Sequence, residues 1–206
     1  YLGGTPTSDT DQTTADLRSA WEENGVTVLD PAPAQDKNGF VVTADTAAEY
    51  GLSTVSDLAK ADGALVLGGP PECPEREFCL MGLESVYGLT FAEFKPLDVG
   101  GSLTVEALAG DQIDVGLLFT TDGVITSRGF VLLDDDKGLQ PAENIIPAVL
   151  KSVADEYGSN LADVLNAVSA VLTTEDLTLM NQRVGYDGED LVTVATEWLK
   201  DNGLVS

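Results

Sequence analysis

Short runs of aliphatic and β-branched residues alternate with helical signals along the first two thirds of the chain. This alternation is typical of an α/β protein. The predicted strands are 26–30, 40–43, 64–67, 91–97, 113–119 and 130–133. The predicted helices are 13–24, 44–50, 55–60, 80–87 and 102–108, and most of them end close to a glycine.

The last third of the chain is predicted to be mainly helical. One apolar run, 145–150, leads into three or four helices, and apolar spacing with a period of 3.6 residues marks 161–172 and 177–184. Thr173 and Asp176 have the spacing of a capping box. With 206 residues, the chain is long enough for one or two domains with a sizeable core.

The charge balance excludes one large class of partner. Thirty-five acidic residues face ten basic ones, which leaves a formal charge of −25. Phosphate contacts need cations, so no nucleic acid and no acidic membrane surface is expected as a partner. No run of eighteen apolar residues predicts a membrane-spanning helix, and the opening residues lack the basic start of a signal peptide.

The chain contains no histidine. This absence removes the commonest general base, the Ser-His-Asp and Cys-His arrangements and the usual zinc ligand. The glycine-rich signatures of hydrolases, P-loop enzymes and dinucleotide-binding domains are also missing, so no cofactor and no metal is predicted. Catalysis by a pair of carboxylates stays open, although with so many carboxylates their proximity alone indicates nothing.

Cys73 and Cys79 bracket a short loop that contains a proline. Without further ligands nearby, the pair does not match a zinc site. The spacing favours a local disulfide formed in an oxidising compartment. The alternative is two reduced, packed cysteines in a cytosolic protein.

Four polar clusters follow predicted strands, and ligands of open α/β sheets bind at strand ends. A shared ligand cleft is one interpretation of these clusters, and ordinary solvated loops are the other. The candidate ligand-binding residues are Gln35, Asp36, Lys37, Asn38, Arg76, Phe119, Thr120, Thr121, Asp122, Glu143 and Asn144.

Arg76 is one of only four arginines. Its guanidinium can bind a ligand carboxylate through two parallel hydrogen bonds. The alternative is a salt bridge to Glu72, Glu75 or Glu77.

Several motifs, in this order, resemble the glycine betaine/choline-type osmoprotectant-binding proteins of ABC importers, specifically an actinobacterial branch. The resemblance covers nearly the whole chain. It rests on residues 29–40 (LDPAPAQDKNGF), 68–73 (GGPPEC), 88–96 (GLTFAEFKP), 113–123 (IDVGLLFTTDG), 133–138 (LDDDKG) and 179–184 (LMNQRV).

The resemblance implies a type II periplasmic-binding-protein fold, with two lobes joined by a hinge. Residues 43–129 are expected to form lobe II, and residues 1–42 and 130–206 to form parts of lobe I. The expected hinge crossings lie near 41–43 and 127–130. Family members begin with a further stretch, so lobe I is expected to be incomplete in this chain.

The ligand pattern departs from the family. Members that bind quaternary ammonium use a cage of tyrosines, because aromatic faces attract a desolvated cation. Here Asn38 and Phe119 stand where many members have tyrosine, and a Tyr-Tyr pair is missing at Glu143 and Asn144. We therefore expect a polar, hydroxyl-bearing compatible solute or related metabolite rather than classical betaine, with Arg76 holding any acidic group. A glycine betaine/choline-like solute is the alternative.

The resemblance implies a solute-binding receptor that closes on a small molecule and docks on a membrane permease, not an enzyme. It also implies an extracytoplasmic lipoprotein on the outer face of the cytoplasmic membrane. Two other hypotheses remain: an enzyme that uses Asp36, Asp122 or Glu143 as acid and base, and a ligand-sensing domain on the same scaffold.

Overall fold

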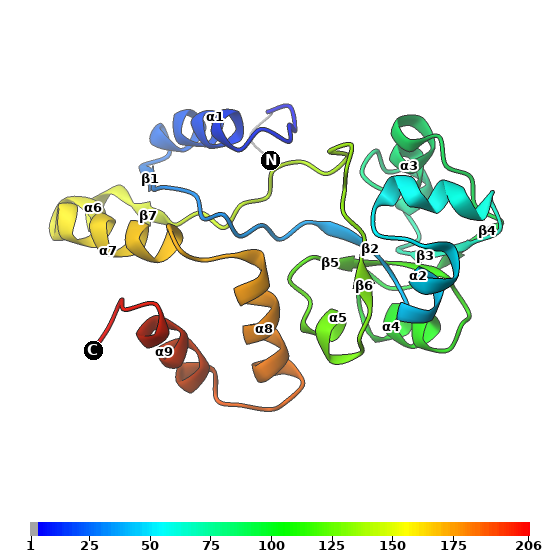
Figure 1. Ribbon diagram of the computed structural model, residues 1–206. Helices are drawn as coiled ribbons and strands as arrows, with labels where there is room; N and C mark the ends of the chain where they lie inside the picture. The colour runs from blue at the N-terminus through cyan, green and yellow to red at the C-terminus, as the bar shows by residue number, and fades with distance from the viewer. Residues whose placement is uncertain (1–3) are drawn as a thin grey trace. The chain divides into compact units, whose positions relative to one another are not determined.

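The computed structural model describes residues 4–206, which divide into two compact units. Unit 1 contains residues 4–36 and 141–206, and unit 2 contains the continuous segment 37–140. The chain therefore passes from one unit to the other twice, at 36/37 and at 140/141 (Figure 1).

Unit 2 is built on a five-stranded mixed sheet with the order β4-β3-β5-β2-β6. The central strand β5 pairs in parallel with β3 and antiparallel with β2. The strands are β2 (Asn38–Val42), β3 (Val66–Gly69), β4 (Glu93–Pro96), β5 (Val115–Phe119) and β6 (Val131–Leu132). The helices are α2 (Ala44–Tyr50), η1 (Val55–Ala61), η2 (Cys73–Glu75), α3 (Leu80–Tyr87), α4 (Ser102–Ala109) and α5 (Gly123–Ser127).

The sheet of unit 2 is covered on both faces. Successive side chains of a strand point to opposite faces of the sheet. On one face, Phe40 and Leu117 join a core cluster with residues of α2, η1 and α3. On the other face, Val41 and Leu118 join a second cluster with residues of α4 and α5. Burial on both faces explains why β5 is a continuous apolar run rather than an alternating one. Gly68 allows the second cluster to approach β3, since a Cβ there would lie 2.6 Å from Ile113 Cδ1.

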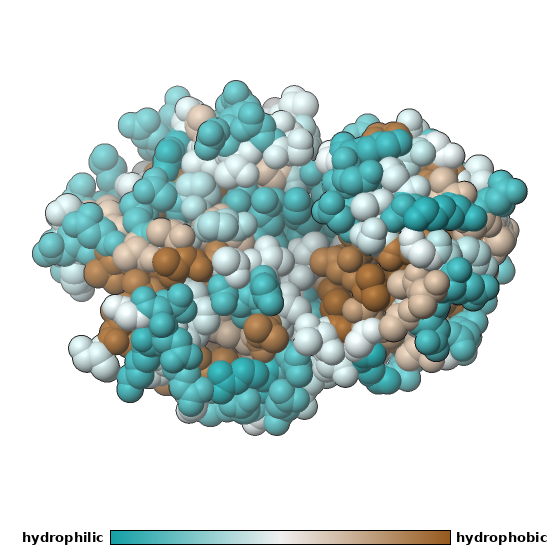
Figure 2. Space-filling view, in the orientation of Figure 1, coloured by the Kyte–Doolittle hydropathy of each residue, from teal (hydrophilic) through white to brown (hydrophobic). Residues whose placement is uncertain are grey.

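Unit 1 combines a two-stranded antiparallel sheet with five helices in its described part (Figure 1). The elements are α1 (Thr10–Glu22), β1 (Val26–Val28), β7 (Ala148–Leu150), α6 (Lys151–Tyr157), α7 (Ser159–Ser169), α8 (Thr174–Gly185) and α9 (Leu191–Asp201). The predicted capping box at the start of α8 is confirmed, because the hydroxyl of Thr173 accepts from Asp176 N and the Asp176 carboxylate accepts from Thr173 N. Apolar side chains remain exposed on these helices, as Figure 2 shows over α7, where Val164 is 63% exposed.

The unit boundaries differ from the predicted lobe boundaries of 42/43 and 129/130. β2 and β6 belong to the sheet of unit 2, because β2 pairs with β5 and β6 pairs with β2. The segment 37–42 and the segment 130–140 are therefore part of unit 2. The predicted helices 44–50 and 80–87 are confirmed with the predicted bounds, whereas the five-residue helix α5 has no counterpart among the predicted elements.

Tyr87, at the end of α3, anchors the loop that follows β6. Its hydroxyl donates to Asp135 Oδ1 at 2.5 Å and accepts from Lys137 N at 2.9 Å. Burial, together with the hydrogen bond to Asp135, raises the pKa of Tyr87 well above the ordinary tyrosine value of about 10. Protonated Tyr87 therefore stabilises the fold at every pH below that ordinary value, and this stabilisation is lost as the pH rises through the raised pKa.

We expect Tyr87 to be the last tyrosine to ionise in the folded protein. An alkaline titration followed by absorbance at 295 nm should lose its most alkaline step in the Tyr87→Phe variant, because phenylalanine has no hydroxyl. If the variant instead loses a step near pH 10, the hydrogen bond to Asp135 does not hold the proton on Tyr87.

Candidate binding site

The polar residues predicted in unit 2 come to one edge of its sheet. β3 and β5 run in parallel, so their carboxyl ends lie at the same edge. β2 runs the other way, and its first residue, Asn38, pairs with the last residue of β5, Phe119. The segments that follow β3 and β5 thus lie at the same edge as the start of β2, which is where open α/β sheets bind ligands.

The first of two cavities at this edge has a volume of about 300 Å³, at the lower end of the range for small-molecule sites. We call it the Gln140 cavity. It contains three of the predicted residues, Lys37, Asn38 and Thr120. Its walls are formed by Lys37, Asn38, Gly39, Phe40, Val55, Thr120, Leu132, Leu133, Asp134, Asp135 and Gln140.

The second cavity is smaller, about 50 Å³, and we call it the Arg76 cavity. It shares Asn38 with the Gln140 cavity, so that residue lines both cavities. Its walls are formed by Asn38, Pro70, Glu72, Cys73, Arg76, Cys79, Val99 and Leu117.

Arg76 has no carboxylate partner among residues 4–206, and its side chain is exposed. The other three arginines are all paired: Arg18 with Asp30, Arg128 with Glu106, and Arg183 with Glu189 and Glu197. The predicted alternative, a salt bridge to a neighbouring glutamate, is therefore not formed. In a chain with thirty-five carboxylates, an unpaired guanidinium beside a cavity favours the recognition of an acidic group on a ligand.

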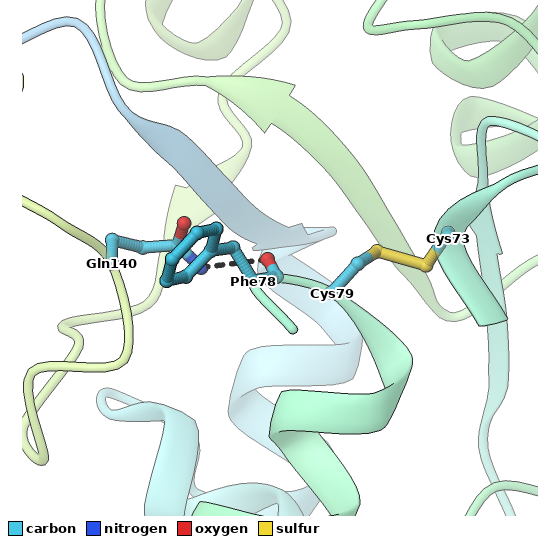
Figure 3. The surroundings of a disulfide bond; sticks show 4 residues. All are labelled: Cys73, Phe78, Cys79 and Gln140. Atoms are coloured by element: carbon cyan, nitrogen blue, oxygen red, sulfur yellow. Dashed lines mark hydrogen bonds between the residues drawn. A yellow bond between two sulfur atoms is a disulfide. The ribbon is translucent and has the colours of Figure 1, made fainter. Parts of the chain in front are cut away.

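The predicted disulfide between Cys73 and Cys79 is confirmed, and both cysteines are buried. It closes the loop that carries Arg76 and joins η2 to the start of α3. Gln140 fixes the same loop from the other side, because its Nε2 donates to Phe78 O at 3.0 Å (Figure 3). The loop that presents Arg76 is thus held by the disulfide and by a hydrogen bond next to Cys79.

The turn after β5 is held by a hydrogen bond within it and by one from Lys37, the residue before β2. Asp122 Oδ2 accepts from Phe119 N at 2.9 Å, and Thr120 Oγ1 accepts from Lys37 N at 3.0 Å. Thr121 is buried. A Cβ at Gly100 would lie 3.3 Å from the ring of Phe119, which places that ring against the loop before α4. Asp122 and Thr120 therefore contribute to the shape of the edge.

The four remaining predicted residues belong to unit 1. Gln35 and Asn144 form an isolated antiparallel bridge, and Asp36 N donates to Glu143 O at 3.0 Å. Both ends of the Asn144 amide are used inside the unit, since Oδ1 accepts from the hydroxyl of Thr10 and Nδ2 donates to Ala32 O. The predicted residues thus fall into two groups, one in each unit, and the prediction of a single shared cleft stays a prediction.

The sequence did not indicate Gln140, Asp134 or Asp135 as site residues. Asp134 and Asp135 belong to the family motif at 133–138, and a single glutamine before a proline has no recognisable pattern. Within the described residues, no cluster of three or more potential metal ligands occurs. None of the helices in residues 4–206 combines the length and apolar character that a membrane crossing requires.

Comparison with known proteins gives one consistent match. Residues 3–201 match the family described as "Substrate binding domain of ABC-type glycine betaine transport system". The glycine betaine-binding protein YehZ of Escherichia coli is 30% identical over 88% of this chain and 62% of its own length. The carnitine transport binding protein OpuCC of Listeria monocytogenes is 28% identical over 98% of this chain and 65% of its own length.

A solved structure described as a glycine betaine/carnitine/choline ABC transporter is 26% identical and superposes with a TM-score of 0.87. The match covers 98% of this chain and 74% of that one. The α/β fold of type II periplasmic binding proteins is therefore confirmed. The chain spans less than two thirds of the length of the two curated relatives.

Proposed function

We propose that this chain, which belongs to the family of substrate-binding domains of ABC-type glycine betaine transport systems, is part of the receptor of an ABC importer. In this proposal it captures a small polar compatible solute and delivers it to a membrane permease. The family consists of binding domains and not of enzymes, so Asp36, Asp122 and Glu143 are not needed as acid and base.

The observation that carries the proposal is the unpaired Arg76 beside a cavity that shares Asn38 with a larger one. An arginine binds a carboxylate through two parallel hydrogen bonds, and Asn38 supplies an amide next to it. The relatives are named for glycine betaine and carnitine, and each of these solutes carries a carboxylate and a trimethylammonium group. We propose Lys37, Asn38, Arg76 and Thr120 as ligand contacts in unit 2, and Gln35, Asp36 and Glu143 as candidates in unit 1.

The lining of the two cavities supports a polar solute. Recognition of a quaternary ammonium group by a cage requires several aromatic faces. Among residues 4–206, the only aromatic residue lining either cavity is Phe40, which is 2% exposed and belongs to the core. Six of the eleven residues that line the Gln140 cavity carry side chains that form hydrogen bonds, which favours a hydroxylated solute over one recognised by its methyl groups alone.

The mechanism is binding and motion without chemistry. In this proposal the solute contacts both units, and the chain crossings at 36/37 and 140/141 act as the hinge of closure. The closed form then docks on the permease. A ligand stabilises the closed form only by the difference in its affinity for the two states, so contacts to both units are essential.

We also propose an extracytoplasmic location. The Cys73–Cys79 disulfide supports it, because disulfides persist in oxidising compartments. Attachment to the membrane as a lipoprotein and descent from an actinobacterial branch follow from the motif resemblance. Labelling of the full-length protein with a fatty-acid analogue in the native host tests the anchor, and an unlabelled protein would contradict it.

A thermal-shift screen of the full-length protein tests the proposed function. The panel contains betaines, choline, carnitine, polyols, sugars and amino acids. A ligand at one hundred times its dissociation constant adds about 2.7 kcal/mol to the free energy of unfolding. For a protein of this size we expect an increase in Tm of about 5–10 °C with at least one compatible solute. No shift with any solute would contradict the proposed function.

A further inference from the structure

Gln140 is a fully buried polar residue with one half of its amide unused. It is 2% exposed and is the last residue of unit 2. Its Nε2 donates to Phe78 O, whereas its Oε1 accepts no hydrogen bond from any residue of 4–206 (Figure 3). Gln140 also lines the larger of the two cavities. A buried carbonyl without a donor is costly, so a donor that is not part of the described chain is expected there.

The neighbouring acidic side chain already has its donors. Asp135 Oδ1 accepts from the hydroxyl of Tyr87 and from Leu139 N, and Oδ2 accepts from Gln140 N. Asp135 therefore serves the fold. Gln140 is a residue of the cavity wall whose buried Oε1 still lacks a donor. This oxygen is uncharged, so it selects for a hydrogen-bond donor rather than for positive charge.

We infer that Gln140 is a specificity-determining residue whose carbonyl accepts a hydrogen bond from a hydroxyl group of the bound solute. This inference rests on the proposed function and names the class of solute: a compatible solute that carries an O–H donor. Glycine betaine has no O–H or N–H group at all and leaves the carbonyl unpaired. A site built to bond a hydroxyl discriminates strongly against an analogue that lacks it.

Carnitine and γ-butyrobetaine form a matched pair of probes. Both carry one carboxylate and one trimethylammonium group on the same carbon chain, and they differ only in a hydroxyl. We expect the full-length protein to bind carnitine about tenfold more tightly than γ-butyrobetaine in isothermal titration calorimetry. Gln140→Met preserves the volume and removes both the Oε1 acceptor and the Nε2 donor to Phe78 O. The loss of the donor affects both probes alike, whereas the loss of the acceptor affects only carnitine, so the ratio should fall to about one. Gln112→Met, an exposed glutamine of the same unit, should retain the wild-type ratio.

Each outcome decides the inference. Equal affinities in the wild-type protein overturn it, because a water molecule then satisfies Gln140 Oε1. A preference that persists in Gln140→Met also overturns it. The affinity of the variant for γ-butyrobetaine shows that its site is intact. If the variant does not fold, the ratio of the two affinities in the wild-type protein alone tests the inference. If neither probe binds and no other solute of the panel does, the proposed function itself is overturned.

Discussion

The Arg76→Gln variant should bind carnitine and glycine betaine about 10- to 100-fold more weakly than the wild-type protein. Arg76 lines a cavity and has no carboxylate partner within residues 4–206, so its guanidinium is available for the carboxylate of a ligand. Hydrogen bonds to charged groups contribute about 1.5–3 kcal/mol each, which sets the size of the expected loss. Calorimetric titration of the full-length protein measures it.

Two controls show whether the loss reflects recognition of an acid. Choline carries no carboxylate, so its affinity should change less than about threefold in Arg76→Gln. Arg128→Gln makes the same chemical change at an arginine that is paired with Glu106 on the surface of the same unit, and it should leave every affinity unchanged. An equal loss for choline and carnitine would show that Arg76 shapes the site without contacting a carboxylate.

Removal of the Cys73–Cys79 disulfide should lower both stability and solute affinity. The bridge closes a short loop between residues that lie six positions apart, and the loss of such a constraint costs about 2 kcal/mol. We expect the double variant Cys73→Ala/Cys79→Ala to unfold about 5–10 °C below the wild-type protein. Affinity for carboxylated solutes should fall as well, because the same loop presents Arg76.

A reducing agent provides the matched control for this variant. It should lower the Tm of the wild-type protein and leave that of the double alanine variant unchanged, since the variant has no bond to reduce. An unchanged Tm and an unchanged affinity in the variant would mean that Gln140 and the packing of α3 hold the loop without the disulfide.

Local patterns predicted most elements of the fold, whereas the boundaries of the two units depend on strand pairing over long sequence distances. The helices 44–50 and 80–87 end at glycines with positive φ, Gly51 and Gly88, which are local stop signals. The two units meet at 36/37 and 140/141 and not at 42/43 and 129/130, because β2 and β6 join the sheet of unit 2 through pairing with residues far away in the sequence. Helix α5 is too short to show a helical period.

A candidate site residue can be singled out from the sequence when its residue type is rare in the chain. It cannot be singled out when its role depends only on how it packs in the fold. Arg76 attracts attention as one of four arginines in a strongly acidic chain. Gln140 acquires its importance from complete burial and from an unused carbonyl, which no sequence pattern signals. Asn144 is the opposite case. It lies in one of the predicted polar clusters, yet its amide forms hydrogen bonds with Thr10 and Ala32 of the same unit.

A crystal structure of the full-length protein with bound carnitine tests the central claim most directly. We expect the carboxylate within hydrogen-bond distance of the Arg76 guanidinium and the hydroxyl within hydrogen-bond distance of Gln140 Oε1. A solute bound with its carboxylate held by other groups, and with Arg76 in solvent, would contradict it.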